Sequence, residues 1–436
     1  MRRSLLILLL VLLLPWTVPG TGHALTLQEG LGIVTSRGRR VQIAAANQDA
    51  AAEEISLSRS KRLPQVALFA RQSLLAYQPE ARFGPSGPVP VADKNSLSYG
   101  FRASQLLYDF GRSSSSLRAA ALRSRAQGFS TETTRNAVAR DFIMAYIALL
   151  EAEKQLDVAQ DEVSRYESHM GEAKAMYEEG LVTVNDLLRA KVVLSDAMQK
   201  KVSAQSALSV RASVVNNLLL RPLSAQVKPD EISTATFYPK PDLDLATRTA
   251  ENLRPELREL QSRIEAKEAT VRSLRASSYP TISLNGGFDY EENEYMVHES
   301  NWNLTAGVTL NLYSGGRMGA KLRQAEAQLD ALRVEREAAV GRVGLEVREA
   351  VLGLRSADER LAAAQDGVKQ AEENLRLLTL RYEEGESTAT GVQDSVTLLA
   401  RAKTSYWSAL YGLQRETALL IFAQGLDLVE AYNHGK

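Results

Sequence analysis

Histidine and cysteine are the side chains that most often bind metals or carry out proton transfer and nucleophilic attack near neutral pH. This chain of 436 residues has no cysteine and four scattered histidines, His23, His169, His298 and His434. It contains no HExxH, GxSxG or phosphate-loop motif and no Cys/His cluster. These absences argue against an enzyme, a bound cofactor and a metal site, and the missing cysteine excludes disulfides.

Composition and charge narrow the class further. The formal net charge is zero, so the chain has no overall basic field of the kind that attracts nucleic acid. Aromatic residues make up only 6% of the sequence, and abundant Ala, Leu, Glu and Arg favour long helices.

The N-terminus has the pattern of an export signal. Arg2 and Arg3 precede an apolar run from Leu5 to Leu14, and a Pro/Gly-rich stretch then ends in Gly22-His23-Ala24, with small residues at positions −3 and −1 of a cleavage site after Ala24. We therefore expect residues 1–24 to be a signal peptide, because ten apolar residues are too few for a membrane anchor. No later stretch approaches 18 apolar residues, which leaves a soluble periplasmic or secreted protein, or a β-barrel.

Two tetrapeptides reveal an internal duplication. YEEG occurs at 177–180 and again at 382–385, 205 residues later (382 − 177). The same offset relates YDFGR at 108–112 to YSGGR at 313–317. Between these anchors, apolar residues recur with alternating spacings of 4 and 3, which is typical of a coiled-coil surface. In the second copy this series comprises Ala350, Leu354, Ala357, Leu361, Ala364, Val368, Ala371, Leu375, Leu378 and Tyr382.

Each copy therefore predicts a long helical hairpin. The helix from Arg317 to Tyr382 would be about 99 Å long at 1.5 Å per residue. Gly180 and Gly385 can adopt the positive φ that ends a helix, and second helices are expected at about 185–220 and 391–424.

Upstream of each long helix the hydrophobic period changes from 3.5 to 2. Apolar residues from Trp302 to Leu312 alternate with polar ones, and those from Ile282 to Tyr290 do the same. The first copy is less regular, because Gln105 interrupts its apolar series. We predict strands at about 64–76, 96–109, 280–290 and 301–313, with helices at 26–62 and 242–277 preceding the two strand pairs.

The domain organisation follows from this order. We expect a first repeat at 25–220, a proline-rich linker or equatorial segment at 221–241, a second repeat at 242–425 and a C-terminal tail at 426–436. Four strands are too few to close a barrel, and open sheet edges are not tolerated in lipid. A membrane location would therefore demand oligomerisation, whereas a soluble four-stranded sheet packed on a helix gives the same alternation.

The chain resembles the TolC-type outer-membrane factor family. The resemblance rests on LTLQE at 25–29, LYSGGR at 312–317, YEEGEST at 382–388 through Asp394, and the duplicated element order. It implies a mainly α fold with a membrane part: a homotrimer forming a 12-stranded transmembrane β-barrel on a coiled-coil α-barrel tunnel, in the outer membrane of a Gram-negative bacterium. Such proteins are passive exit ducts for efflux or type I secretion, coupled to a periplasmic adaptor protein and an inner-membrane pump of RND, ABC or MFS type.

Two alternatives explain less of the chain. A periplasmic coiled-coil scaffold accounts for the helices but leaves the strand from Trp302 unexplained. A simple porin accounts for the strands but not for the long hairpins.

The resemblance also assigns site residues. Family members often carry two acidic residues three apart after the second tip, where this chain has Gly391 and Asp394, while the first copy has Asp186 and Arg189. We expect Asp394, and then Asp186, to line the pore, although a helix-dipole role would also explain either carboxylate.

Further positions follow from the same architecture. The tips would contact the adaptor through Gly180, Leu181, Val182, Thr183, Gly385, Glu386, Ser387 and Thr388. Strand-to-helix joints are expected at Gly111, Arg112, Gly316 and Arg317, with the serines at 113–116 capping the first helix. Lipid-facing residues would be Trp302, Leu304, Val308, Leu310 and Leu312.

Overall fold

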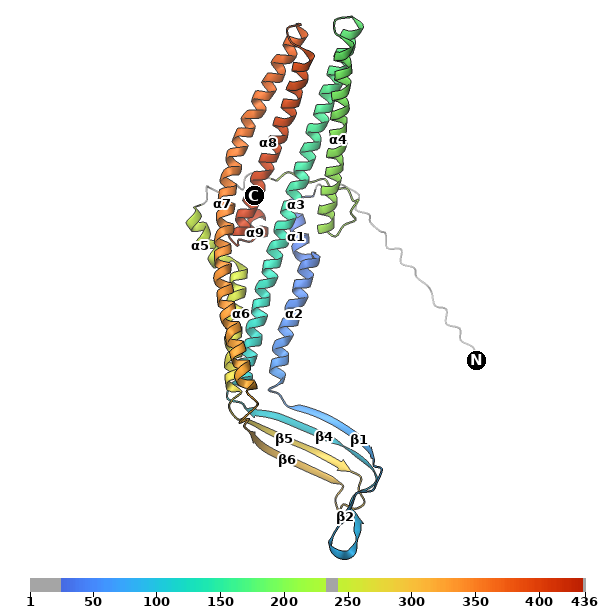
Figure 1. Cartoon of the computed structure of the whole chain (residues 1–436), viewed down its shortest axis with the longest axis vertical. Helices are drawn as coiled ribbons and strands as arrows, with labels where there is room; N and C mark the ends of the chain where they lie inside the picture. Colours follow the sequence, from blue (N-terminus) through green and yellow to red (C-terminus); the bar gives the residue numbers. More distant parts are fainter. Residues whose placement is uncertain (1–24, 233–241, 434–436) are drawn as a thin grey trace, which may run out of the picture.

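The computed structural model describes residues 25–232 and 242–433 and shows long helices extending from one side of a four-stranded sheet (Figure 1). The predicted signal peptide, the end of the predicted linker and the last three residues of the predicted tail lie outside these residues. His23 and His434 lie outside them as well.

The duplication predicted from the sequence is confirmed by matching elements in the two halves. Long helices α3 and α7 have 67 residues each, and the returning helices α4 and α8 have 35 each. The first half contains α1 (Leu27–Arg37), α2 (Arg39–Ser60), β1 (Gln65–Leu74), β4 (Asn95–Tyr108), α3 (Arg112–Glu178) and α4 (Val184–Leu218). The second half contains α5 (Leu243–Leu253), α6 (Pro255–Ala276), β5 (Thr281–Glu291), β6 (Ser300–Thr309), α7 (Arg317–Glu383) and α8 (Ala389–Ala423), followed by α9 (Leu428–Asn433). The loop between β1 and β4 adds a small hairpin of β2 (Glu80–Arg82) and β3 (Pro88–Pro90).

The prediction of one continuous helix before each strand pair was wrong. The first is interrupted at Gly38, whose ψ of 136° is extended, and the second at Arg254, with a ψ of 118°. Arg254 precedes Pro255, and the proline ring disfavours a helical conformation in the preceding residue. The break at Gly38 occurs where glycine lowers helix propensity most among the non-proline residues.

The four long strands form one antiparallel sheet in the order β1-β4-β5-β6. β4 and β5 are central and come from different halves of the chain, so the sheet joins the two repeats (Figure 1). β1 and β6 each pair on one side within the described chain, which leaves one open edge on each of them.

The main hydrophobic cluster lies near the middle of α3, away from the sheet. Phe142, Tyr146 and Ile147 are fully buried there and pack with residues of α1, α8 and α9. The Tyr146 hydroxyl oxygen lies 2.7 and 2.6 Å from the carbonyl oxygens of Leu25 and Asp230, and it accepts a hydrogen bond from the N–H of Asp230 at 2.8 Å. The start of the described chain and the described part of the linker are thereby fixed to α3, and α9 gives structure to the predicted tail.

Beyond this cluster the helices form two antiparallel hairpins, α3–α4 and α7–α8 (Figure 1). The predicted heptad positions face inward: those of the second copy are buried or half-buried from Ala350 to Tyr382. The first copy follows the same pattern except at its last position, because Tyr177 is exposed where Tyr382 is buried.

Candidate functional site

The two helix turns are built alike at their first residues. Gly180 and Gly385 have φ of 75° and 77°, which confirms their predicted role in ending α3 and α7. In the first tip the N–H of Gly180 donates to Tyr177 O at 3.0 Å and that of Leu181 to Met176 O at 2.8 Å. The second tip repeats both bonds, so each turn is a Schellman motif that satisfies the last helix carbonyls.

The predicted pore carboxylates have different surroundings. In the first tip, the Thr183 hydroxyl and N–H both donate to Asp186, at 2.7 and 3.1 Å, and these bonds hold the pKa of the Asp186 carboxyl below its usual range. Asp186 therefore caps α4. Asp394 is exposed on α8 and makes no hydrogen bond or ion pair with the described residues.

The second tip uses a weaker cap. Thr388 Oγ1 accepts from the N–H of Gly391 at 3.3 Å, and no carboxylate returns the contact, because residue 391 is a glycine. Arg189 Nη1 donates to Thr390 Oγ1 at 2.9 Å. This bond brings the two tips, which lie about 200 residues apart in the sequence, into contact.

A polar contact between the two hairpins was not predicted from the sequence. Tyr166 on α3 contacts Thr397 Oγ1 at 2.8 Å and donates to Gln393 O at 3.2 Å. His169 lies beside it, buried, with Nε2 3.3 Å from the Gln393 amide nitrogen, and burial lowers the pKa of its imidazole. The sequence analysis grouped His169 with the other scattered histidines. It lies one residue before Met170, which is equivalent to the heptad position Leu375 (375 − 205), and this place in the series was the available signal of burial.

The predicted adaptor-contact residues are mostly exposed at the tips. Leu181 is 69% exposed. Thr183, Glu386 and Thr388 are also exposed, while Val182 and Ser387 are half-buried.

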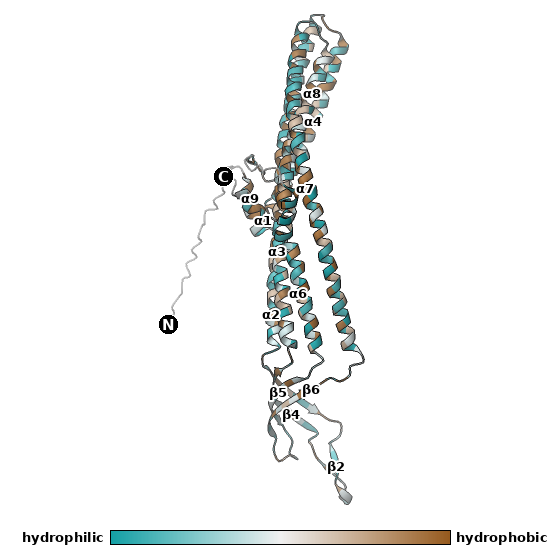
Figure 2. Cartoon of the chain, turned by 90° about the vertical axis from the view of Figure 1, so that its left-hand side faces the viewer, coloured by the Kyte–Doolittle hydropathy of each residue, from teal (hydrophilic) through white to brown (hydrophobic). Residues whose placement is uncertain are grey.

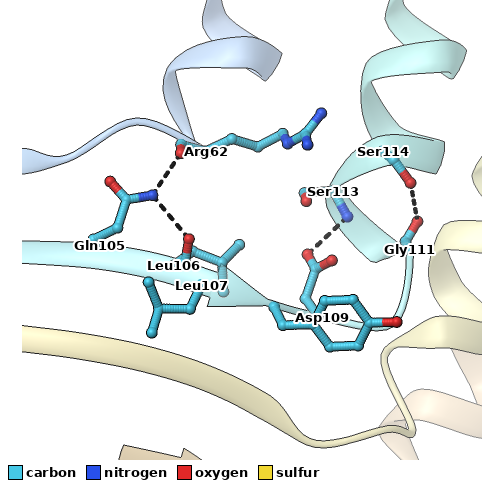
Figure 3. Close-up of a pocket in the computed structure, with 9 residues that line it drawn as sticks. Arg62, Gln105, Leu106, Leu107, Asp109, Gly111, Ser113 and Ser114 are labelled. Atoms are coloured by element: carbon cyan, nitrogen blue, oxygen red, sulfur yellow. Dashed lines mark hydrogen bonds between the residues drawn. The ribbon is translucent and has the colours of Figure 1, made fainter. Parts of the chain in front are cut away.

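The strand-to-helix joints depend on glycine, as predicted. Gly111 and Gly316 have φ of 86° and 76° and precede α3 and α7 directly. The predicted cap by the serines at 113–116 was wrong. The Asp109 carboxylate caps α3 instead, accepting from the Ser113 N–H at 2.8 Å, while Ser114 donates to the Gly111 carbonyl (Figure 3).

Gln105, the residue that interrupts the apolar alternation of β4, lies in the same region. Its amide donates to the carbonyls of Arg62 and Leu106, at 2.7 and 2.8 Å (Figure 3). Gln105 therefore satisfies the backbone where α2 passes into β1, which explains a polar residue on an otherwise apolar face.

The sheet has one apolar and one polar face. Directly paired residues point to the same face of a sheet, and the row Leu68, Phe101, Phe288 and Trp302 crosses all four strands. Trp302 contacts Phe101 and Phe288 with ring centroids 5.6 and 5.1 Å apart. Further apolar-face residues are Val66, Ala70, Tyr99, Ala103, Ile282, Leu284, Tyr290, Leu304, Ala306 and Val308.

Leu310 and Leu312 were predicted on the last strand, but β6 ends at Thr309. Thr309 pairs with Thr281, and the next partner would be Pro280. Proline has no N–H to donate, so the hydrogen-bonded ladder stops there. Leu310 and Leu312 instead lie exposed in the segment that leads to α7.

Within residues 25–232 and 242–433, no helix combines the length and apolar character needed to cross a membrane. Nor do the same residues bring together three or more side chains suited to holding a metal ion.

Comparisons with known proteins agree with this architecture. A family model described as outer membrane efflux protein matches residues 33–217 and 246–426. The outer membrane protein TolC of Vibrio cholerae is 25% identical over 378 residues, which cover 84% of this chain and 83% of that protein. The toluene efflux pump outer membrane protein TtgF of Pseudomonas putida is 23% identical over 306 residues, 69% of this chain but only 63% of TtgF. The match thus spans less than two thirds of TtgF's length.

Solved structures share the fold. A membrane protein from Pseudomonas aeruginosa matches with a TM-score of 0.80 and 18% identity, over 93% of this chain and 91% of that one. The open state of the Neisseria gonorrhoeae MtrE outer membrane channel matches with a TM-score of 0.76 and 22% identity, over 92% and 89%. Because the family model covers most of both halves, the chain belongs to the outer membrane efflux protein family.

Proposed function

We propose that this protein is the outer-membrane channel of a tripartite efflux system, a passive exit duct. The observation that carries the proposal is the amphipathic sheet, whose apolar face runs unbroken across four strands from Leu68 to Trp302. Trp302 and Leu304 are exposed on that face. A continuous exposed apolar surface on an exported protein marks an interaction with lipid or with a partner.

Closure of the sheet would remove its two open edges. Pairing of β6 with β1 of the next copy is heterologous, and a heterologous interface forms a closed ring when the rotation per copy allows it. We infer three copies and twelve strands, with the apolar face toward lipid and the polar face toward the lumen. Twelve strands are within the range of known outer-membrane barrels.

The helices would extend the duct across the periplasm. A 67-residue helix is about 100 Å long. Apolar residues remain exposed along α4 and α7, and Figure 2 shows them at intervals along α7. We infer that neighbouring copies cover these residues and that the six hairpins of a trimer form the tunnel.

The tips would meet the partners of the system. Leu181 supplies an exposed apolar contact for a periplasmic adaptor, which in turn connects the duct to an inner-membrane pump. Relatives named for efflux of toluene and of antibiotics favour efflux over protein secretion for this chain. Asp394, exposed and free of ion pairs within the described chain, is the pore-facing carboxylate of the proposal.

Cell fractionation and cross-linking test the channel. We expect the protein in the outer-membrane fraction, migrating as a trimer, and a purified sample that conducts ions in a planar bilayer. A soluble monomer in the periplasmic fraction would exclude the channel and favour a periplasmic scaffold.

Single-channel recording tests the role of Asp394. Removal of a ring of three carboxylates should widen the opening and raise conductance in the Asp394→Ala variant. Asp358→Ala removes an exposed carboxylate on the neighbouring helix α7, away from the tip, and serves as the matched control. Equal conductance in both variants and the wild type would remove Asp394 from the gate.

A further inference from the structure

The polar face of the sheet carries a cluster of charged side chains in the middle of the strands. Residue pairing defines two neighbouring rows on this face, Ala67–Arg102–Gly287–Asn303 and Phe69–Gly100–Asp289–Asn301. The rows are two residues apart along each strand, so their side chains share one face. They place one arginine, one aspartate and two asparagines at nearly one level of the sheet.

Contacts within this cluster fix the arginine. The Arg102 guanidinium lies over the Phe69 ring, 4.4 Å from its centroid, which is a cation–π contact. Its Nη2 is 3.9 Å from Asp289 Oδ1, and Asn303 Nδ2 donates to Asp289 Oδ2 at 3.0 Å. The charged group therefore has a defined position, although the Arg102 side chain is 68% exposed.

Small residues make room for this arrangement. Gly100 lies between Phe69 and Asp289 in its row, and Ala67 and Gly287 flank Arg102 in the other. A Cβ on Gly100 would lie 2.0 Å from the Phe288 carbonyl oxygen, so only glycine permits this approach of β4 and β5. The close approach is built into the strands that carry Arg102 and Asp289.

The polar face carries charges of both signs, but they are not equally accessible to a solute. Arg71 and Glu291 share another row, on either side of Ser98, and have opposite signs. At the level of the cluster, Arg102 is 68% exposed but Asp289 only 39%, and the Asp289 carboxylate is hydrogen-bonded by Asn303. The guanidinium is thus the charge that a passing solute meets first.

We propose that Arg102, held by Phe69 and Asp289, forms a selectivity ring inside the barrel that favours anionic solutes such as carboxylates. The inference rests on the proposed channel function, which turns the polar face toward the lumen and repeats the cluster three times. A planar guanidinium matches the geometry of a carboxylate, and its aromatic support keeps it in place. Rings of fixed arginine charge select anions in pores.

The absence of cysteine makes a direct test available. Arg102→Cys introduces the only thiol of the chain, and charged methanethiosulfonate reagents can then place either sign of charge at this position. The full-length trimer is measured in a planar bilayer under a KCl gradient, and the reversal potential reports the ratio of anion to cation permeability. Arg102→Gln should lower this ratio about fivefold, the effect of one unit charge at about 4 Å in water.

The modified variants give the sharper result. The cationic reagent on Arg102→Cys should restore the wild-type ratio, and the anionic reagent should lower it beyond Arg102→Gln. Leu68→Cys on the apolar face is the matched control and should respond to neither reagent. Each variant is also measured together with Asp394→Ala, so that the tips do not mask a change in the barrel.

Channels whose reversal potential is unchanged by Arg102→Gln in both backgrounds would overturn the selectivity ring and leave the channel intact. A wild-type protein that inserts no conducting pores would overturn the channel itself, and the ring with it.

Discussion

Helices α3 and α7 are equal in length and occupy equivalent places in the two repeats, yet their surroundings differ. α3 is packed by α2, α4, α6 and α8, whereas α7 contacts α5, α6 and α8. Ile147 on α3 and Leu352 on α7 are equivalent positions, 205 residues apart. Ile147 is 0% exposed and Leu352 is 51% exposed.

This difference shows that a duplicated sequence pattern does not fix the burial of its residues. Phe129 on α3 and Val334 on α7 are a second pair of equivalent apolar residues. On α7 both Val334 and Leu352 are exposed, whereas Phe129 and Ile147 on α3 are half-buried and buried. Exposed apolar residues along one helix are expected where another chain covers them. We therefore expect α3 to stabilise the single chain and, in the proposed trimer, α7 to contact a neighbouring copy.

The largest effect should come from the buried member of the pair. Ile147→Ala leaves a cavity in the main cluster and should lower the free energy of unfolding by about 2–5 kcal/mol. Urea titration followed by circular dichroism measures this loss. A loss below that of Leu352→Ala would contradict the assignment of α3 as the stabilising helix.

On α7 we expect a smaller effect, on the stability of the trimer and not on that of the single chain. Leu352→Ala removes a half-exposed side chain, so the fold of the single chain should be nearly unaffected. If a neighbouring copy covers this position, the trimer should lose about 1–2 kcal/mol per copy, a part of the value for a fully buried leucine. A dilution series in detergent, analysed by light scattering, measures the dissociation. Gln370→Ala, at an exposed polar position of the same helix, should leave it unchanged.

Much of the fold could be predicted because the signals are local and periodic. The offset between the two YEEG segments gave the duplication, and the heptad and alternating patterns gave helices and strands close to their observed ends. The predicted element ends were wrong where a single residue interrupts a helix or strand although the hydrophobic period continues. Pro255 and Gly38 interrupt helices whose apolar pattern continues, and Pro280 ends the ladder before Leu310.

The candidate site was harder to predict, because its contacts join distant parts of the sequence. The glycines of the helix turns and of the strand-to-helix joints could be predicted, because a positive φ is easily adopted only by glycine. The bond from Arg189 to Thr390 and the contact of His169 with Gln393 depend on how two hairpins pack, and no spacing in one repeat encodes this. Asp186 and Asp394 were both predicted to line the pore. Of these two residues, only Asp186 has a threonine donor at hydrogen-bond distance.

The smallest expected effect is a difference in stability between the first turns of α4 and α8. Exchanging the residues at positions 186 and 391 tests this difference in both directions. Asp186→Gly gives the first tip the cap of the second, and Gly391→Asp does the reverse. The first change removes a cap interaction and should destabilise the start of α4 by about 1 kcal/mol. The second should stabilise the start of α8 by a similar amount, because a Thr388–Asp pair would form and a helical glycine is removed. A Cβ at 391 would lie 3.2 Å from the flexible Ser387 side chain, which can rotate away.

Acid distinguishes the tips as well. Because hydrogen bonds lower the pKa of Asp186, its contribution is complete above the ordinary carboxyl pKa of about 4 and is lost as pH falls through the lower folded value. Hydrogen exchange at the tips, measured by mass spectrometry at pH 5 and pH 3, should show α4 opening more at the lower pH, beyond the change in intrinsic exchange. The start of α8, with Gly391, should show no such increase, and Gly391→Asp should introduce one. Equal acid responses of the two wild-type tips would mean that the Thr183–Asp186 pair does not stabilise the start of α4, and that the tips differ in sequence without differing in stability.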